Sequence, residues 1–339
     1  MTMKVDLFYL SPNPYGGWVT YTCHLMEALE SVGVEVNLFK IRPRSEKNKR
    51  KFGYDKEYRN ITMVEALVRP TMKLIVAGAK QFKEQTKELY EFGNASIVVH
   101  DPTELKNMPK GLDPRRCVVI RKIGLETLTD VNALRLRVPT FIRHPYSCGE
   151  PAGEVPENRL FNAVSTSRID FDKHTEILLD ANRLIEEHHQ IDIRGFENRL
   201  YTKFKIVPKY SEWVQSKAHY PRERNYARRL MLDYKFNVDM TVIKGDGGGT
   251  QYTWLEAWSA GCIPIINTEW LLEDPDDMIP GYNCIAVAGA KELAELLQGK
   301  YLPFYKLREL QLGGYRSLEQ HNAHMIGGEY LAFLTGQAV

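Results

Sequence analysis

The stretch GDGGGTQYTWLEAWSAGCIPIIN, residues 245–267, decides the fold class. Its three consecutive glycines let the backbone turn through conformations closed to other residues and approach a ligand closely. A helix is expected next, with Thr250 or Thr253 as its N-cap and Gly261 at its C-terminal end. The apolar run CIPII then fits a buried strand. With the preceding residues VDMTVIK as a further strand, this is the repeating unit of an α/β fold.

The same unit is suited to an anion. A helix N-terminus carries a partial positive charge and N–H donors that bind phosphates. Glu256 follows Thr253 by three residues, so both side chains share one helix face. A nucleotide diphosphate at the helix start, with the Glu256 carboxylate on the ribose hydroxyls, would use all of these features. The residues alone leave open a plain strand-to-helix connection.

Length and composition indicate a globular protein of two domains. The chain has 339 residues, enough for two cores of ordinary size. Its hydrophobic fraction of 43% is too high for a disordered chain. The five cysteines are odd in number and include no Cys-x-x-Cys pair, which favours reduced thiols in a cytoplasm. No leader pattern and no apolar run of about 18–20 residues is present, so we expect a soluble cytoplasmic protein without a membrane partner.

The N-terminal residues predict the first domain. Residues 4–10 and 34–39 read as strands and residues 19–32 as a helix with an apolar stripe. Gly16 and Gly17 lie in the turn between the first strand and the helix. They lack the full Gly-x-Gly-x-x-Gly pattern, which excludes a dinucleotide fingerprint. A tight turn is the alternative to a ligand-binding role.

A short apolar strand at residues 96–99 places His100 and Asp101 at its carboxyl end. Open parallel sheets bind ligands at that edge. An aspartate there can take the proton of an acceptor hydroxyl, or orient that hydroxyl. The alternatives are that Asp101 caps the following turn and that His100 is structural.

The turn-rich residues 147–158 mark a domain boundary. We expect a first domain at residues 1–150, joined by a returning helix at about residues 325–339, and a second at residues 151–324. The second domain opens with a strand at 162–167 and a long helix at 174–188. Between them lie Arg168 and Lys173, which can converge on a diphosphate, although loops often contain such basic pairs.

Two regions are strongly basic. Residues 42–51 carry six basic residues against one acid, a pattern of solvated loops that also suits a phosphate backbone. Residues 194–235 carry eleven basic residues against four acids, interspersed with aromatic residues. This mixture suits nucleic-acid contact, and the alternative is a charged helical surface over an aromatic core. The candidate DNA-binding residues are Lys203, Lys205, Arg222, Arg224, Arg228 and Arg229.

Four stretches carry a resemblance to a known family, at residues 96–101, 162–175, 194–206 and 245–266. The run YTWLEAWSAGCIPII, residues 252–266, resembles the donor-binding signature of retaining GT-B glycosyltransferases of the family 4 type. Both it and RGFENRLYTKFKI, residues 194–206, are similar to the phage DNA α-glucosyltransferases within that group. The resemblance implies two Rossmann-like domains facing across a cleft. It also implies transfer of a sugar from a UDP-sugar, with retention, to the hydroxymethyl group of a modified pyrimidine in duplex DNA.

The resemblance also implies roles for single residues. His100 and Asp101 would face the reacting sugar, and no metal cofactor is expected because basic side chains neutralise the diphosphate. One departure concerns the glutamate that family 4 enzymes carry eight residues before Glu256, because Gly248 stands there and leaves the sugar undetermined. The rival classes are a transferase for a lipid, glycan or small molecule and a non-catalytic binding protein. The implied donor-binding residues are Gly16, Gly17, Arg168, Lys173, Gly249, Thr250, Tyr252, Thr253 and Glu256.

Overall fold

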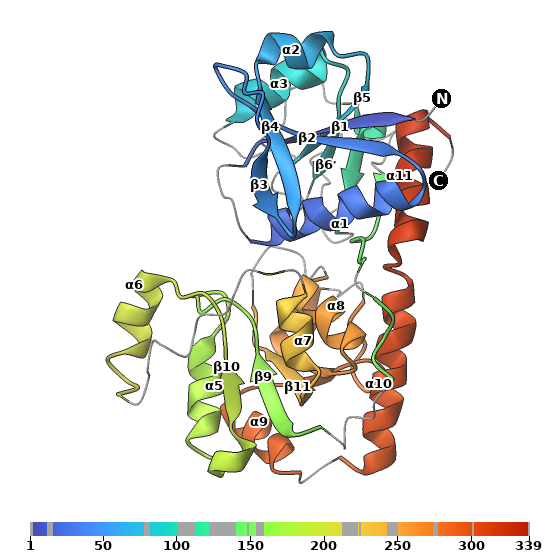
Figure 1. Ribbon diagram of the computed structural model, residues 1–339. Helices are drawn as coiled ribbons and strands as arrows, with labels where there is room; N and C mark the ends of the chain where they lie inside the picture. The colour runs from blue at the N-terminus through green and yellow to red at the C-terminus, as the bar shows by residue number, and fades with distance from the viewer. Residues whose placement is uncertain are drawn as a thin grey trace. The chain divides into compact units, whose positions relative to one another are not determined.

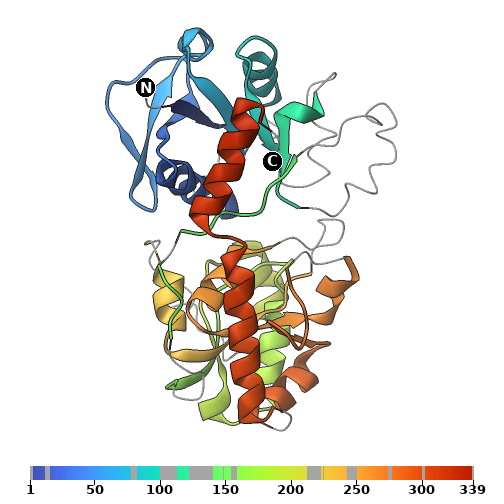
Figure 2. The same cartoon turned by 90° about the vertical axis from the view of Figure 1, so that its right-hand side faces the viewer.

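The computed structural model forms two units, which we describe separately. The first unit comprises Met1–Ser147 and Gln320–Val339, and the second comprises Cys148–Glu319. Figures 1 and 2 show both units in two views. The residues described by the structure are 3–11, 16–77, 82–99, 113–121, 140–147, 149–153, 159–211, 223, 225–242, 250–273, 277–299 and 302–337.

The first unit is built on a sheet with the strand order β3-β4-β2-β1-β5-β6-β7-β8. Every pair is parallel except the β3–β4 hairpin. The loop expected at residues 42–51 is therefore shorter than predicted, because Arg50 and Lys51 begin β3. The strands are β1 (Lys4–Tyr9), β2 (Glu35–Ile41), β3 (Arg50–Gly53), β4 (Lys56–Ile61), β5 (Met72–Val76), β6 (Ser96–Val99), β7 (Cys117–Val119) and β8 (Thr140–Phe141).

Helices cover this sheet. Residues of α2 and α3 share one hydrophobic cluster with β1, β2, β5 and β6. Helices α1 and α11 pack on each other, away from α2 and α3 in Figure 1. A Cβ at Gly327 would lie 2.1 Å from the carbonyl oxygen of Ala28, so this close packing requires glycine. The helices are α1 (Gly17–Ser31), α2 (Met63–Val68), α3 (Lys83–Glu91), the 3₁₀ turn η2 (Pro114–Arg116) and α11 (Ala323–Thr335).

The second unit has an all-parallel sheet with the order β10-β9-β11-β12-β13. The chain runs from β9 to β10 on one side and returns to place β11 on the other side of β9. This reversal makes the carboxyl ends of β9 and β11 the expected ligand edge. The strands are β9 (Phe161–Ser165), β10 (Ile191–Ile193), β11 (Tyr234–Asp239), β12 (Ile263–Asn267) and β13 (Ile285–Val287).

Both faces of this sheet are covered. On β9, Ala163 packs with residues of α5 and α9, whereas Val164 packs with residues of α7 and α8. Successive side chains of a strand point to opposite faces, so two layers of helices enclose the sheet. The helical elements are α5 (Thr175–Asn182), η6 (Glu187–His189), α6 (Arg199–Tyr201), the π-helix η7 (Thr202–Ile206), α7 (Tyr226–Met231), α8 (Tyr252–Ser259), η9 (Thr268–Glu273), α9 (Ala290–Leu297) and α10 (Phe304–Glu319).

The α/β class expected from the sequence is confirmed, but two element bounds were wrong. The long helix predicted at 174–188 ends at Asn182, whose side chain accepts a hydrogen bond from the Ile191 backbone at 2.8 Å and donates one back at 3.0 Å. The strand predicted from VDMTVIK begins at Tyr234 and ends at Asp239.

Two further observations concern the described residues of both units. Among the helices that the structure describes, none is long and apolar enough to cross a membrane. The four cysteines among the described residues are buried and form no disulfide: Cys23, Cys117, Cys262 and Cys284.

Candidate functional site

A single buried carboxylate joins the carboxyl ends of β9 and β11. Asp239 is 1% exposed. It accepts hydrogen bonds from the Ser167 hydroxyl at 2.7 Å, from the Thr241 backbone N–H at 3.1 Å and from the Thr241 hydroxyl. The Thr253 hydroxyl on α8 donates to it at 3.1 Å. Asp239 therefore fixes two strand ends and a helix at the point where the strand order reverses.

The charge of Asp239 is balanced by Lys173. Burial alone would raise the pKa of Asp239, but the Lys173 ammonium and the hydrogen bonds from Thr241 and Ser167 hold that pKa below its ordinary value. The carboxylate is thus ionised at neutral pH. A negative charge in the interior in turn favours a fixed positive charge on the loop above it.

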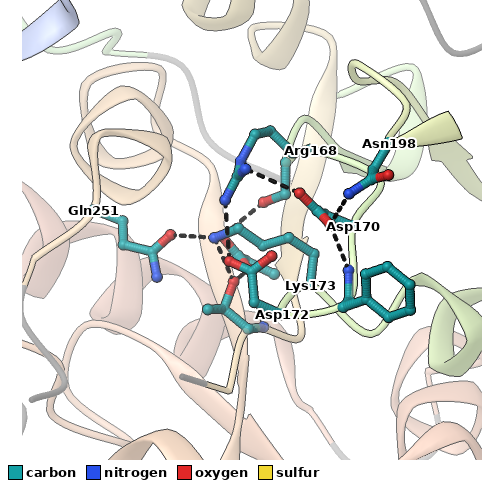
Figure 3. A network of polar contacts seen from close by, with 10 residues as sticks. Arg168, Asp170, Asp172, Lys173, Asn198 and Gln251 are labelled. Atoms are coloured by element: carbon teal, nitrogen blue, oxygen red, sulfur yellow. Dashed lines mark hydrogen bonds and ion pairs between the residues drawn. The ribbon is translucent and has the colours of Figure 1, made fainter. Parts of the chain in front are cut away.

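Lys173 is held in place by two oxygen atoms. Its Nζ donates to the Thr241 hydroxyl and to the Gln251 side-chain oxygen, both at 2.7 Å, and the residue is 9% exposed. Figure 3 shows Lys173 reaching from its loop to Gln251 at the start of α8. The ammonium is therefore positioned before any ligand binds.

The expected capping of α8 was wrong. The N-cap is Gln251, and its side chain forms no capping bond because it accepts from Lys173. The Thr250 hydroxyl donates to Asp277, and the Thr253 hydroxyl donates to Asp239. Carboxylate acceptors give stronger hydrogen bonds than neutral ones, which explains why both threonine hydroxyls bond to carboxylates and do not cap the helix. The predicted C-terminal stop is confirmed, because Gly261 follows the C-cap with φ +73°.

Arg168 lies at the surface beside this cluster. Its guanidinium donates to Asp170 at 3.0 Å and to Asp172 at 3.1 Å, and its side chain is 56% exposed (Figure 3). Asp170 also accepts from the Asn198 side chain at 2.8 Å. The loop is thereby attached to the segment after β10, where the Asn198 N–H donates to the Ile169 carbonyl at 2.8 Å. Two carboxylates therefore orient the Arg168 guanidinium, and its exposed side remains accessible to an anion.

Glu256 is a buried acid in the second turn of α8. It is 8% exposed, and burial raises its pKa to about 8. No positive group among the described residues offsets that shift. A carboxyl group desolvated without a counter-charge costs stability, and such groups are concentrated at functional sites.

The two glycines at the start of α1 belong to the first unit. Gly16 is the N-cap of α1 at φ +100° and ψ −175°, a conformation open to glycine alone. Gly17 begins the helix. A Cβ at either position would have no atom within 4 Å among the described residues. Gly16 is therefore required by the turn itself, whereas Gly17 is not.

Several predicted site residues lie outside the described residues: His100, Asp101, Arg222, Arg224 and Gly249. Tyr252 is half-buried in the first turn of α8.

Lys203 and Lys205 are exposed on η7, in a segment that stands out from the second sheet in Figure 1. The two tyrosines near them do not form a stacking surface, whereas Phe204 between them is exposed. Tyr201 and Tyr210 are buried, and their hydroxyls donate to Glu176 and, at 2.9 Å, to Asp180. For these two rings the structure supports the reading of an aromatic core.

Two of the candidate arginines make contacts within the second unit. Arg228 donates to the Ser259 hydroxyl at 2.7 Å and to the Glu150 carbonyl at 2.9 Å. Arg229 forms an ion pair with Glu223 at 3.0 Å. Both guanidinium groups are therefore already engaged by partners within this unit.

Sequence reasoning missed the residue at the centre of this site. Asp239 was placed inside an apolar strand, Ser167 at the end of another strand, and Thr241 and Gln251 drew no site prediction. The sequence feature that could have identified Asp239 is its position at the end of the run KFNVD, where a buried strand ends. A charged residue in that position either breaks the strand or serves a site at its carboxyl edge.

Comparison with known proteins identifies the fold. No family model and no curated protein matches the sequence. HepE from Anabaena in complex with UDP matches with a TM-score of 0.67 at 11% identity, over 98% of this chain and 100% of that one. An α-glucosyltransferase in complex with UDP and a 13-mer DNA containing an HMU base matches with a TM-score of 0.67 at 12% identity, over 99% of this chain and 100% of that one. The lipopolysaccharide outer core galactosyltransferase WaaB matches with a TM-score of 0.61 at 11% identity, over 98% of this chain and 99% of that one.

At these identities the matches establish the fold alone. The chain has the GT-B glycosyltransferase fold, with two Rossmann-like units, as the sequence predicted.

Proposed function

We propose that this protein is a glycosyltransferase that moves a sugar from a UDP-sugar, with retention, to the hydroxymethyl group of a modified pyrimidine in duplex DNA. The observation that carries the transferase assignment is the cluster around Asp239 and Lys173 at the strand reversal of the second sheet. It fixes a buried cation at the edge where an open α/β sheet binds nucleotides.

In this proposal the diphosphate of the donor meets Lys173 and Arg168. Lys173 supplies a fixed point charge, and Arg168 supplies a fork that can exchange its carboxylate partners for phosphate oxygens. Gly249, Thr250, Tyr252 and Thr253 place the start of α8 against the same group. Glu256 accepts hydrogen bonds from the ribose hydroxyls. The two cations neutralise the leaving diphosphate, so the proposal includes no metal cofactor.

The reaction breaks the bond between the anomeric carbon and the diphosphate oxygen. The acceptor hydroxyl oxygen forms the new bond to that carbon, UDP leaves with the electron pair, and the hydroxyl proton passes to a base. We assign that role to Asp101, with His100 beside it, and we assign the close backbone approach to the donor sugar to Gly16 and Gly17. The acceptor hydroxyl sits on a base edge, so the nucleotide must leave the stack to react.

The exposed segment after β10 supports a DNA acceptor. Residues 199–209 carry four basic residues and no acid. Lys203 and Lys205 in this segment form no ion pair with any residue that the structure describes. Unpaired surface cations release counterions from a phosphate backbone when they bind it. Arg222 and Arg224 stay in the proposed DNA surface, whereas Arg228 and Arg229 would have to leave their present partners.

The test is a transfer assay with mass readout. Hydroxymethylated duplex DNA is incubated with a panel of UDP-sugars, digested, and its nucleosides are weighed. We expect a mass gain of one sugar residue on the hydroxymethylated nucleoside and none on an unmodified duplex. Lys173→Met provides the inactive control. Donor hydrolysis without any modified nucleoside would reject the DNA acceptor, and absence of both transfer and hydrolysis would leave a non-catalytic binding protein.

One observation favours a second acceptor class. Leu200, Phe204 and Val207 are 62%, 62% and 56% exposed, and their spacing of four and three residues places them on one helical face. Apolar side chains flanked by lysines on a short helix suit the surface of an anionic membrane. The second candidate is therefore transfer to a lipid-linked acceptor. Sedimentation with phosphatidylglycerol vesicles but not phosphatidylcholine vesicles, lost in Phe204→Ser, would favour it.

A further inference from the structure

A small pocket opens at the carboxyl edge of the first unit's sheet, and nothing in the proposed donor site uses it. Tyr9 and Ser11 line it from the end of β1, Lys40 and Arg42 from the end of β2, and Gln85 from α3. Ligands of open parallel sheets bind at this edge. The pocket is thus a natural position for a group of the substrate.

The notable residue of this pocket is Lys40, a buried lysine without an anionic partner. It is 7% exposed. Its ammonium lies over the rings of Tyr58 at 4.9 Å, Tyr9 at 5.1 Å and Phe52 at 5.9 Å. No hydrogen bond or ion pair joins its ammonium to any other described residue. The ring faces attract a cation, but they carry no net charge to neutralise it.

The electrostatics of Lys40 agree with this geometry. Burial lowers its pKa, and the neighbouring Arg42 lowers it further. Both effects act against the charged form, and no carboxylate opposes them. The charged neighbour of this largely buried lysine is another cation, so no described counter-ion replaces the water that its side chain loses on burial.

The same sheet shows how a buried lysine is satisfied when its role is structural. Lys73 on β5 is also 7% exposed. Its ammonium donates to the Arg69 carbonyl at 2.7 Å and to the Thr71 carbonyl at 3.4 Å. Burial lowers its pKa too, but the Asp6 charge opposes that shift. Among the described residues, Lys40 has neither kind of compensation, and an anion from outside could supply it.

The chain that follows β2 extends the positive charge. Residues 42–51 carry five more basic than acidic residues. Some of these charges are neutralised, since Arg50 pairs with Glu46 at 2.5 Å and Lys49 with Glu57 at 3.3 Å. Arg42 forms no ion pair with a described residue. Arg42 is exposed and also lies near the Glu46 carboxylate, whose pKa it helps to lower. Lys40 is the buried cation of the pocket, and no described carboxylate offsets the lowering of its pKa.

We propose that Lys40 and Arg42 form a phosphate-binding site that holds a phosphate group of the acceptor. The identity of the acceptor rests on the proposed function, which makes the group a phosphodiester of the DNA backbone. A small phosphorylated acceptor would present the same chemistry. In either case Arg42 meets the anion at the surface and Lys40 meets it in the pocket.

The first measurement is the salt dependence of binding to a short duplex without hydroxymethylated bases. Lys40→Met keeps the apolar stem among the aromatic rings and removes the charge, and Arg42→Gln removes the exposed charge. Each variant should reduce the slope of log K against log salt by about one unit. Lys73→Met, which removes an equally buried lysine from the same sheet, should leave the slope unchanged. Melting curves of all variants establish that they are folded.

The second measurement separates the two sources of phosphate. Inorganic phosphate and glucose 6-phosphate are titrated into wild type and the same variants at constant ionic strength. A reduced salt slope for duplex binding, together with lost binding of the two small phosphates, supports a DNA phosphate. Loss of binding to the two small phosphates with an unchanged duplex slope supports a small acceptor. If neither changes, or if Lys73→Met changes both as much, the site does not exist.

The transfer assay is independent of these results. A protein that binds phosphate through Lys40 but never modifies DNA refutes the DNA acceptor and keeps the site. If Lys40→Met does not fold, Arg42→Gln carries the same test, since its side chain is exposed.

Discussion

Two buried lysines stand at the carboxyl edges of the two sheets, and their surroundings differ. Lys173 in the second unit donates to two oxygens and is balanced by the charge of Asp239. Lys40 in the first unit has aromatic rings and a second cation around it. In the second unit, the ammonium of Lys173 is held in a fixed position before a ligand binds, as a rigid diphosphate site requires. In the first unit, the ammonium of Lys40 has no anionic partner among the described residues.

Removing the anion that completes the Lys173 site should have the largest effect on folding. Asp239→Asn loses a charged acceptor of hydrogen bonds from Ser167, Thr241 and Thr253. We expect a loss of about 3 kcal/mol in the free energy of unfolding, measured with urea at neutral pH. The exposed Asp233, immediately before the same strand, is the matched control, and Asp233→Asn should stay within about 0.5 kcal/mol.

The pH dependence gives this prediction a sign. The pKa of Asp239 is lower in the folded than in the unfolded chain. Its contribution is therefore present above the unfolded value of about 4 and is lost as the pH falls through the folded value. Wild type and Asp239→Asn should approach each other in acid. A difference that stays constant down to that range would mean that the carboxylate charge is not what stabilises the cluster.

Substitution of the two lysines should have different effects on UDP affinity. Lys173→Met should weaken UDP about ten- to a hundredfold, because a charged hydrogen bond is worth roughly 1.5–3 kcal/mol. Lys40→Met should leave UDP affinity unchanged, since its proposed ligand is a phosphate of the acceptor. Calorimetry with UDP on both variants decides the point. Equal losses would contradict the assignment of the UDP diphosphate to Lys173 and Arg168.

Glu256 sharpens the comparison because it is the uncompensated group of the second unit. If its carboxylate accepts the ribose hydroxyls, binding requires the ionised form. Its pKa of about 8 in the free protein then makes UDP affinity fall about tenfold for each pH unit below 8. Glu256→Gln should bind UDP more weakly at pH 8 and lose the pH dependence. An affinity that is flat from pH 6 to about 8 in the wild type would remove Glu256 from the site.

The same substitution should stabilise the protein without ligand. Burial raises the pKa of Glu256 in the folded protein to about 8, above its value in the unfolded chain. The folded protein therefore loses stability as the pH rises from the unfolded pKa through the folded pKa, because the buried carboxyl group has to ionise. At high pH the neutral glutamine avoids that cost, so Glu256→Gln should gain roughly 1–4 kcal/mol over wild type. Thermal melting at acidic and alkaline pH measures it. No gain in alkali would mean that the carboxylate has a compensating partner.

The sequence predicts this fold well where continuous apolar runs form buried strands, and β6 has both ends as expected. It fails for α10, a long helix for which no prediction was made. Gly313 and Gly314 interrupt its pattern. A Cβ at these positions would lie 1.9 Å from the Tyr282 carbonyl oxygen and 2.5 Å from the Trp258 ring. The glycines are required by tertiary packing, which local propensity does not contain.

The candidate site was predictable only in part. The sequence points to Arg168, Lys173 and Glu256 because the stretches around them resemble those of family 4 glycosyltransferases. The role of Lys40 does not show in the sequence, because it depends on rings that come from distant residues. Phe52 and Tyr58 belong to the hairpin β3–β4, and Phe52 closely follows a run that reads as a solvated loop. An uncompensated charge is a property of its surroundings and needs the fold to be seen.

The smallest expected effect on folding concerns the neighbouring glycines of the first unit. Gly17 has helical surroundings and open space at its Cβ position, so Gly17→Ala should gain about 0.5 kcal/mol from the unfolded chain. Gly16→Ala is the contrasting variant and should lose roughly 1–3 kcal/mol, because φ +100° is closed to alanine. Urea unfolding of both variants measures these changes. If the donor sugar lies against this turn, Gly17→Ala should also slow transfer while the protein becomes more stable and UDP affinity stays the same. A Gly17→Ala enzyme that is more stable and equally fast would show that the glycine pair serves the turn alone and does not contact the donor sugar.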